Sequence, residues 1–121
     1  MPKIDIKVRL KSNENPSTYD LTGTINKEKD VRTYFEPTEE KTKVKYFYKE
    51  NKLVRDNKNL NMTYIFDLKK ETNGVLYIKA LRKDLYVKVK TKKLEIKNHN
   101  VQIIFSVEQE EFEYEIELKE D

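Results

Sequence analysis

The sequence predicts an all-β protein that forms a single antiparallel meander β-barrel of about 8–10 strands. Apolar and charged residues alternate, most clearly from Phe112 to Leu118, where glutamates occupy every second position. Such alternation places apolar side chains on one face of a strand and polar side chains on the other. Turn signals recur about every 8–12 residues, and no window shows the 3.6-residue apolar repeat of a long helix. A run of hairpins favours a closed barrel because closure removes exposed strand edges.

The first part of the chain predicts three strands. Residues 4–11 and 19–25 alternate cleanly, and Gly23 inside the second strand indicates a bend, a bulge or a close backbone approach. Residues 31–36 form a short third strand with large side chains on both faces, so the pattern does not identify its inward side. Pro37 then interrupts the sheet.

The middle of the chain predicts two hairpins. Residues 43–49 resume the sheet, and Glu50 and Asn51 turn it into a short strand at 53–55. A long strand at 60–68 leads to a hairpin loop at 69–74. That loop contains Asn73-Gly74, the strongest turn dipeptide in the sequence.

The last part of the chain predicts the remaining strands at 75–81, 85–89, 94–96, 101–107 and 112–118. Lys92 and Lys93 indicate a β-bulge, because Leu94 and Ile96 are out of phase with Val89. If the C-terminal strand lies at a sheet edge, it is able to pair with a second copy, so both a monomer and a homodimer remain open.

The composition excludes several classes of protein. A length of 121 residues suits one domain with its own core. The absence of cysteine excludes disulfides and thiolate metal sites. The N-terminus has no apolar run of a secretory signal, and no stretch approaches the roughly 20 apolar residues of a membrane span. With Met1 at the start, we expect a complete cytoplasmic chain, and the net charge of +3 says little about partners.

Several short motifs follow one another in a fixed order along nearly the whole chain. They are Lys11-Ser12, Gly23, Tyr34-Phe35-Glu36, Thr42-Lys43-Val44-Lys45, Leu53-Val54-Arg55, Asn61-Met62-Thr63-Tyr64-Ile65-Phe66 and Thr91-Lys92-Lys93-Leu94-Glu95-Ile96. In this order they resemble the YwiB-like family of short uncharacterised bacterial proteins. The resemblance implies a lipocalin-like (calycin) β-barrel and no established activity.

The chain also departs from that family. Asp84 and Asp56-Asn57 stand where relatives have glycine, and the absence of tryptophan removes the Gly-x-Trp signature of secreted lipocalins. The resemblance therefore implies a fold rather than a ligand.

No arrangement of residues predicts catalysis. His99 is the only histidine and falls in a predicted turn, so neither an ordinary zinc site nor a serine triad can be assembled. Glu36 is the one acid close to aromatic residues, and we favour a strand-end salt bridge or hydrogen bond for it over a catalytic role. We expect no enzyme activity, no metal and no cofactor.

The basic stretch from Lys79 to Lys97 allows two interpretations. Its cations and interleaved tyrosines suit a nucleic-acid surface. Opposite charges on neighbouring strands, however, stabilise a sheet by roughly 0.2–1 kcal/mol per pair, and an acidic run lies a few strands later. We favour cross-strand pairing over an anion-binding surface. The expected pairs are Lys88 and Lys90 with Glu115 and Glu113, directly or one strand over.

Ligand-binding candidates come from side chains expected inside the barrel or at its mouth. An inward tyrosine needs a partner for its hydroxyl, and several such groups suit water or a small amphipathic ligand. Arg55 is either an ordinary surface or edge arginine, which the pattern favours, or an inward group that meets a carboxylate bidentately. The candidate residues are Arg55, Tyr34, Glu36, Tyr46, Tyr64, Tyr77 and Tyr114.

Two hypotheses for function follow. The first is a non-enzymatic barrel that binds a small amphipathic or anionic ligand in its interior, which requires a cavity of about 300 Å³. The second is an interaction module that binds RNA or an acidic protein through the basic stretch. Nucleic acid is the less favoured partner, and a third reading, an enzyme that uses Glu36, requires that residue to be buried beside a cleft.

Overall fold

The computed structural model describes residues 3–12, 17–26, 31–36, 41–97 and 100–119, with only the backbone described at 3–5, 12, 17–22, 25–26 and 117–119. These residues form ten strands. They are β1 (Lys3–Ser12), β2 (Ser17–Asn26), β3 (Val31–Phe35), β4 (Lys43–Phe47), β5 (Lys52–Asp56), β6 (Leu60–Ile65), β7 (Thr72–Ile78), β8 (Lys83–Lys97), β9 (Asn100–Val107) and β10 (Glu110–Lys119). None of the described residues belongs to a helix long and apolar enough to cross a membrane.

The strands close into an antiparallel meander barrel. Each strand pairs with the next along the chain, and β10 pairs with β1 from Asp5↔Lys119 to Ser12↔Phe112. The predicted fold class is therefore confirmed. The expectation of an edge at the C-terminal strand is wrong, because β10 lies between β9 and β1.

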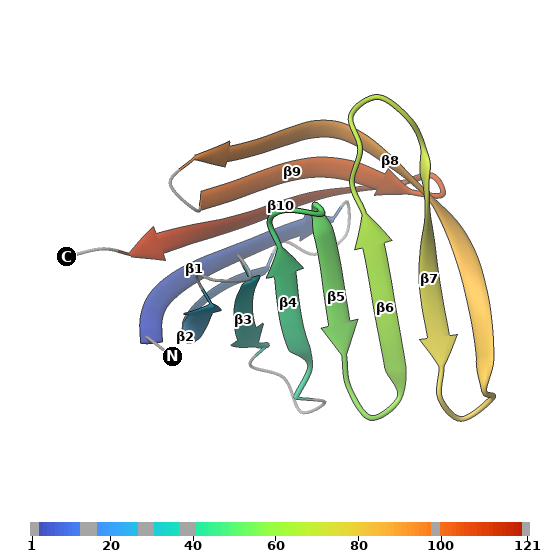
Figure 1. Ribbon diagram of the computed structural model, residues 1–121, viewed down its shortest axis with the longest axis horizontal. Coiled ribbons are helices and arrows are strands. Elements are labelled where there is room, and N and C mark those ends of the chain that lie inside the picture. Colours follow the sequence, from blue (N-terminus) through green and yellow to red (C-terminus); the bar gives the residue numbers. More distant parts are fainter. Residues whose placement is uncertain (1–2, 13–16, 27–30, 37–40, 98–99, 120–121) are drawn as a thin grey trace.

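The barrel is flattened into two crossing layers. Figure 1 shows β3 to β7 side by side, with β9, β10 and β1 crossing behind them and β8 curving from one layer into the other. The register of β8 with β9 shifts between Thr91 and Lys93. This confirms the predicted bulge, and the extra residue explains how one strand bends far enough to serve both layers.

The core consists of the inward-facing side chains of both layers. Phe105 on β9 is its aromatic centre, with ring centroids of Phe66, Phe112 and Tyr64 at 4.8, 5.5 and 6.0 Å. Tyr114 is also buried, as the alternation in β10 predicts. The inward residues beside this cluster that are at most 2% exposed are Ile6, Val8, Val44, Tyr46, Val89, Val101, Ile103 and Ile116.

The hairpin predicted after the strand at 60–68 is present between β6 and β7, but Asn73-Gly74 does not form its turn. Both residues lie inside β7, where they pair with Lys88 and Val87 of β8, and the chain turns earlier, after β6. A Cβ on Gly74 would lie 2.7 Å from the Tyr64 ring, so this glycine serves close packing rather than a turn. The strand predicted at 60–68 ends at Ile65, and Leu68 is exposed.

Other local predictions are confirmed. Asn51 has a positive φ of 49° in the turn between β4 and β5. Gly23 allows a close backbone approach, since a Cβ there would lie 2.7 Å from the carbonyl oxygen of Thr33 on β3. Asn57 closes the turn between β5 and β6, because its side-chain oxygen accepts the backbone N–H groups of Asn59 and Leu60 at 2.9 and 3.0 Å.

The charged walls pair differently from the expectation. Through β9, Glu113 and Glu115 align with Lys93 and Glu95 rather than with Lys90 and Lys88, and Lys90 aligns with Glu111 instead. Cross-strand pairing itself is present. The ion pairs are Lys92 Nζ to Glu111 at 2.6 Å and Arg9 on β1 to Glu115 at 3.4 Å. Glu108 accepts from the backbone N–H of Lys88 at 3.1 Å, not from its charged side chain.

Candidate functional site

The inward side of β3 carries a row of polar groups. Arg32 faces Tyr46 and Tyr34 faces Val44 across the pairing with β4, and Arg32, Tyr34 and Tyr46 are at most 2% exposed. Phe35 points outward and is 56% exposed. The pattern left this face undecided because large residues occupy both sides. The structure assigns Arg32, Tyr34 and Glu36 to one line that runs from the interior to the end of the barrel.

Glu36 and Arg55 form an ion pair at that end. Arg55 lies opposite Val44 and Met62, so it points inward, and its Nη2 donates to both carboxylate oxygens of Glu36, with Oε2 at 2.9 Å. The Glu36 side chain is 10% exposed and that of Arg55 is 36% exposed. Burial alone would lower the pKa of Arg55, but the hydrogen bond and charge of Glu36 outweigh it and raise that pKa.

The pair decides two open questions from the sequence. The strand-end salt bridge predicted for Glu36 is confirmed. The surface or edge interpretation favoured for Arg55 is wrong, and the inward alternative is correct in that this arginine meets a carboxylate. A single nitrogen contacts both oxygens, so the contact lacks the fork geometry of a bidentate arginine.

Deeper in the barrel, the hydroxyl groups of Tyr34 and Tyr114 hydrogen-bond to each other. Both residues are nearly inaccessible, at 2% and 3% exposure. Burial, followed by the proximity of Tyr34, raises the pKa of Tyr114 well above its ordinary value. Tyr114 therefore stays neutral at physiological pH and keeps its hydroxyl proton.

Arg32 lies beyond this tyrosine pair as seen from Glu36. It is fully buried, and its Nε, Nη1 and Nη2 atoms have no hydrogen-bond partner in the part of the chain that the structure describes. Its Cζ lies 5.5 Å from the centre of the Tyr48 ring, within range of a cation–π contact. Burial lowers the pKa of Arg32, and the nearby hydroxyls of Tyr48, Tyr114 and Tyr34 oppose that shift. We call the region of Arg32, Tyr34 and Tyr114 the floor of the site.

An apolar inner cavity of about 80 Å³ lies above the floor. It is lined by Val8, Leu10, Tyr34, Glu36, Val44, Leu53, Arg55, Met62, Tyr64, Phe105, Phe112 and Tyr114. A water molecule occupies about 30 Å³ of liquid, so this space suits a group of only a few heavy atoms. The expectation of a cavity of about 300 Å³ enclosed in the barrel is therefore wrong.

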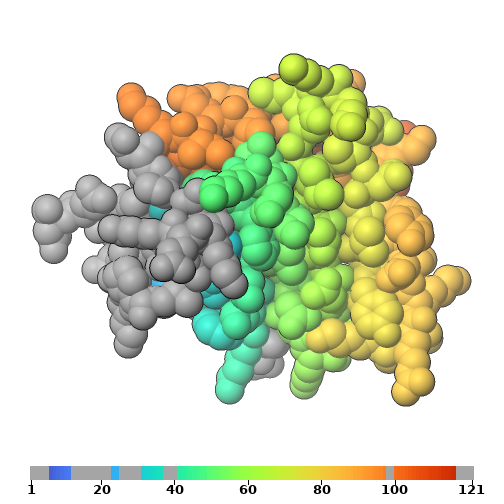
Figure 2. All heavy atoms as spheres, in the orientation of Figure 1, coloured from blue at the N-terminus to red at the C-terminus, as the bar shows by residue number. Residues whose placement is uncertain are grey.

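A larger, polar pocket of about 330 Å³ lies outside the inner cavity, at the end of the barrel. We call it the mouth. Its lining is Glu36, Thr42, Arg55, Asn57, Asn59, Leu60 and Met62. Glu36, Arg55 and Met62 line both spaces, so the ion pair lies at their junction. Figure 2 shows side chains of β4 to β7 covering the broad face of the barrel that is turned to the viewer.

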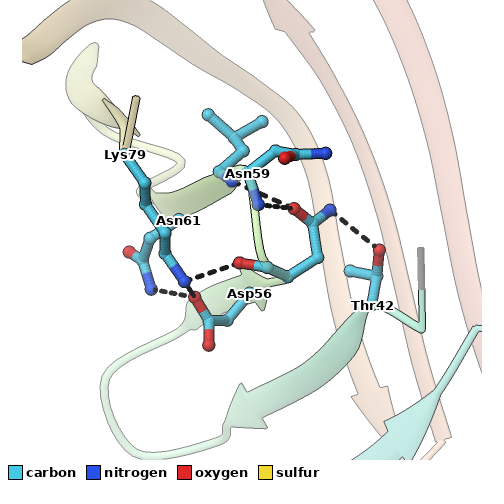
Figure 3. A network of polar contacts seen from close by, with 7 residues as sticks. Thr42, Asp56, Asn59, Asn61 and Lys79 are labelled. Atoms are coloured by element: carbon cyan, nitrogen blue, oxygen red, sulfur yellow. Dashed lines mark hydrogen bonds and ion pairs between the residues drawn. The ribbon is translucent and has the colours of Figure 1, made fainter. Parts of the chain in front are cut away.

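A polar network fixes the wall of the mouth (Figure 3). Asn57 donates from Nδ2 to the hydroxyl oxygen of Thr42 at 3.1 Å. Lys79 donates from Nζ to Asp56 Oδ1 at 2.9 Å and to the carbonyl oxygen of Asn57 at 2.5 Å, and Asn61 also donates to Asp56. The bond from Lys79 and then that from Asn61 lower the pKa of Asp56. The network joins the turn after β5 to β4 on one side and to the turn after β7 on the other.

The structure brings together five of the seven candidate residues. Arg55, Tyr34, Glu36, Tyr64 and Tyr114 all line the inner cavity. Tyr46 is buried away from it, where its hydroxyl donates to Asn51 at 3.3 Å and burial raises its pKa. The inward placement of Tyr77 is wrong. It pairs with Asn61 and Asp84, on the opposite face of β7 from Leu76, which packs against the core.

Sequence reasoning missed Arg32, Thr42 and Asn57. Arg32, Tyr34 and Glu36 occupy every second position, so they share one face of the chain. This spacing indicates an inward Arg32 only if the inward face of β3 is already known. The sequence pattern did not indicate a role for Asn57 at the mouth. His99 lies outside the described residues. Within the described ranges, no group of three His, Cys, Asp or Glu side chains is placed to hold a metal ion.

Comparison with known proteins supports the fold. No family model matches the sequence, and no curated protein matches it significantly. The crystal structure of the YwiB protein from Bacillus subtilis aligns with a TM-score of 0.62 and 16% sequence identity, over 98% of this chain and 91% of that one. The chain has a YwiB-like fold. At this identity the likeness extends to the barrel and its strand arrangement.

Proposed function

We propose that this protein is a non-enzymatic binding protein for a small, partly apolar anion held at the mouth of the barrel. The observation that carries the proposal is the position of the Glu36–Arg55 pair, between an apolar inner cavity and a polar mouth. Ligand sites typically combine an apolar lining with a few placed polar groups. The two spaces differ in size and polarity, so they suit a short apolar group inside and a polar remainder outside.

The charges of the site favour an anion. The described inward groups include two arginines, Arg32 and Arg55, and one carboxylate, Glu36. A buried cation that lacks a partner is costly, so a negative ligand would stabilise this arrangement more than a neutral or cationic one. The third reading, an enzyme that uses Glu36, requires that residue to be buried beside a cleft, and Glu36 does line both spaces with its side chain 10% exposed. Its engagement by Arg55 favours binding over acid–base chemistry.

The alternative, binding of RNA or an acidic protein through the basic stretch, receives less support. Lys79 contacts Asp56, Lys92 contacts Glu111, and Lys93 lies 3.7 Å from Glu95. These contacts commit part of the basic charge within the chain. Binding to single-stranded nucleic acid that weakens steeply between low and moderate salt would favour the alternative.

We also propose membership of the YwiB-like family and a lipocalin-like architecture. The shared fold and the ordered motifs support the first, and the up-and-down meander closed by its first and last strands supports the second. The cytoplasmic location, the absence of a cofactor and the choice between monomer and homodimer stay predictions.

Met62 provides a reporter for ligand binding, because it lines both the inner cavity and the mouth. The sequence has one other methionine, Met1, which serves as a reference. In NMR spectra of the methyl-labelled protein, we expect butyrate to shift the Met62 signal saturably and to leave Met1 nearly unchanged. Acetate and n-butanol test size and charge. A Met62 signal that responds to none of these probes would contradict the proposed function.

A further inference from the structure

The floor of the site contains a cation without a counter-charge among the described residues. Arg32 is 0% exposed, and all three of its side-chain nitrogens lack a hydrogen-bond partner. Arginine has five N–H donors, no acceptor, and a charge that persists at any physiological pH. The Tyr48 ring at 5.5 Å offsets only part of the cost of burying that charge.

The one inward carboxylate of the described residues is already engaged. Both oxygens of Glu36 accept from Arg55 at the mouth. Glu36 directly follows β3 and lies four residues from Arg32, with Tyr34 between them. Extended chain rises about 3.3 Å per residue, so Glu36 lies roughly 13 Å farther along the chain than Arg32. An ion pair between these two residues is therefore out of reach in this arrangement.

The inner cavity lies on the path between the two ends of this line. Tyr34 and Tyr114 line the cavity and hydrogen-bond to each other, and Tyr34 lies two residues from Arg32 on the same face of β3. An acid group at the bottom of the cavity would meet the tyrosine hydroxyl pair first, with the guanidinium behind it. In such a dry setting, the attraction between opposite charges is much stronger than in water.

We propose that Arg32 is the counter-charge for a small carboxylate that enters the mouth acid group first and stops at the Tyr34–Tyr114 pair. The small size of the inner cavity, about 80 Å³, restricts the inserted part to the carboxylate and its first carbons. The rest of the molecule then lies between Met62 and the polar wall of the mouth. This inference rests on the proposed function and adds the ligand class, its orientation and the residue that selects it.

The test compares butyrate with n-butanol on the full-length protein, using the Met62 signal and the thermal unfolding temperature. For the wild type we expect butyrate to bind at least about tenfold more tightly than n-butanol. Arg32→Met should abolish this preference while n-butanol still shifts Met62. Arg9→Met, which removes an outward arginine paired with Glu115, is the matched control and should keep the preference.

The unfolding temperature provides a readout without ligand. Removing an unpaired buried charge should raise it in Arg32→Met, and butyrate should then stabilise the variant less than the wild type. A lower temperature for the variant would mean that the chain itself compensates Arg32, and would overturn the proposal. If Arg32→Met does not fold, Arg32→Gln takes its place in the test. The preference of the wild type for butyrate over n-butanol also tests the proposal.

Failure of the inference differs from failure of the proposed function. If Arg32→Met retains the preference for butyrate and Arg55→Met loses it, the acid group lies at the mouth, and the inference is wrong while the proposed function stands. If the wild type binds both probes equally, Arg32 selects nothing, and the inference is again wrong. If neither probe shifts the Met62 signal, both the inference and the proposed function are wrong.

Discussion

An arginine points inward at the mouth and another at the floor of the site, but only the arginine at the mouth has a charged partner among the described residues. At the mouth, Arg55 is partly exposed and its charge is matched by Glu36. At the floor, Arg32 is fully buried, and its only charge-stabilising contact among the described residues is the ring of Tyr48. A partly hydrated cation is cheap to hold, whereas a fully buried one is expensive, so stability alone would put the carboxylate at the floor.

The carboxylate of Glu36 lies at the mouth instead. The charges of the site therefore depart from the most stable arrangement. Proteins commonly violate local rules of charge and packing at functional sites and compensate for them elsewhere. Here the compensation comes from a closed sheet and a tightly packed aromatic core. Substitutions in the walls, the ion pair, the hydroxyl pair or the outer network test this difference between the two arginines.

The largest effect is expected from Gly23→Ala, which disturbs the floor. A Cβ at this position would lie 2.7 Å from the backbone oxygen of Thr33 and 3.3 Å from Tyr34 Cβ, so β3 itself must move. We expect a loss of about 3 kcal/mol in the free energy of unfolding, measured by urea denaturation.

Gly74→Ala is the matched change at the cavity wall that Tyr64 forms. Its Cβ would meet the ring of Tyr64 at 2.7 Å, but a ring at the cavity wall can shift where backbone cannot. We expect a loss of about 1 kcal/mol and a smaller inner cavity. Equal losses for the two variants would show that the backbone at the floor is no more rigid than the Tyr64 ring at the cavity wall.

Glu36→Gln makes the mouth resemble the floor by leaving Arg55 without its carboxylate. Breaking a buried pair costs several kcal/mol, but Arg55 is 36% exposed, so we expect a loss of about 2 kcal/mol. Binding of butyrate should tighten, because a second cation then lacks a partner. Glu111→Gln, which removes an exposed partner of Lys92, is the control and should cost less than about 0.5 kcal/mol. A loss as small as the control's would mean that the mouth pair is as weak as a surface pair.

The sequence predicts the barrel well because its information is local. Alternation identifies the strands, and the phase change after Val89 locates the bulge at the point where β8 bends. Asn73-Gly74 fails because its role depends on Tyr64, which belongs to another strand. Tyr77 fails because β7 is apolar on both faces between Val75 and Ile78, so alternation gives no direction.

The candidate site is only partly predictable for a related reason. The tyrosines and Arg55 could be proposed because such residues are unusual on an inward face. The pairing of Arg55 with Glu36 and the isolation of Arg32 depend on register between β3, β4 and β5, which sequence spacing does not contain. The size of the inner cavity depends on how closely side chains of both layers interdigitate.

Tyr114→Phe tests whether the hydroxyl pair separates the two arginines. The change keeps the ring and removes one hydroxyl, so Tyr34 loses the partner that it contacts at the bottom of the cavity. We expect a loss of about 1 kcal/mol in the free energy of unfolding and weaker butyrate binding. Tyr86→Phe, at a residue 67% exposed, should change neither quantity. Unchanged butyrate binding in Tyr114→Phe would place the carboxylate away from this pair.

The smallest effect concerns the outer network and depends on pH. Lys79 and Asn61 lower the pKa of Asp56 in the folded protein. A carboxyl whose pKa is lower when folded adds stability above its unfolded value, near pH 4, and loses it as pH falls through the folded value. Asp56 and Lys79 are 46% and 38% exposed, so solvent screening limits the contribution to less than about 1 kcal/mol. Asp56→Asn should therefore be slightly less stable than the wild type at pH 7 and equally stable near pH 2.

The comparison of wild type with Asp56→Asn isolates this group, because every other residue is the same in both proteins. Arg32 keeps its proton throughout this range, so the floor contributes no pH dependence of its own. Urea denaturation at a series of pH values measures the difference in unfolding free energy. If this difference in unfolding free energy stays constant down to pH 2, the network stabilises the mouth through the geometry of its hydrogen bonds, and the charge of Asp56 does not contribute.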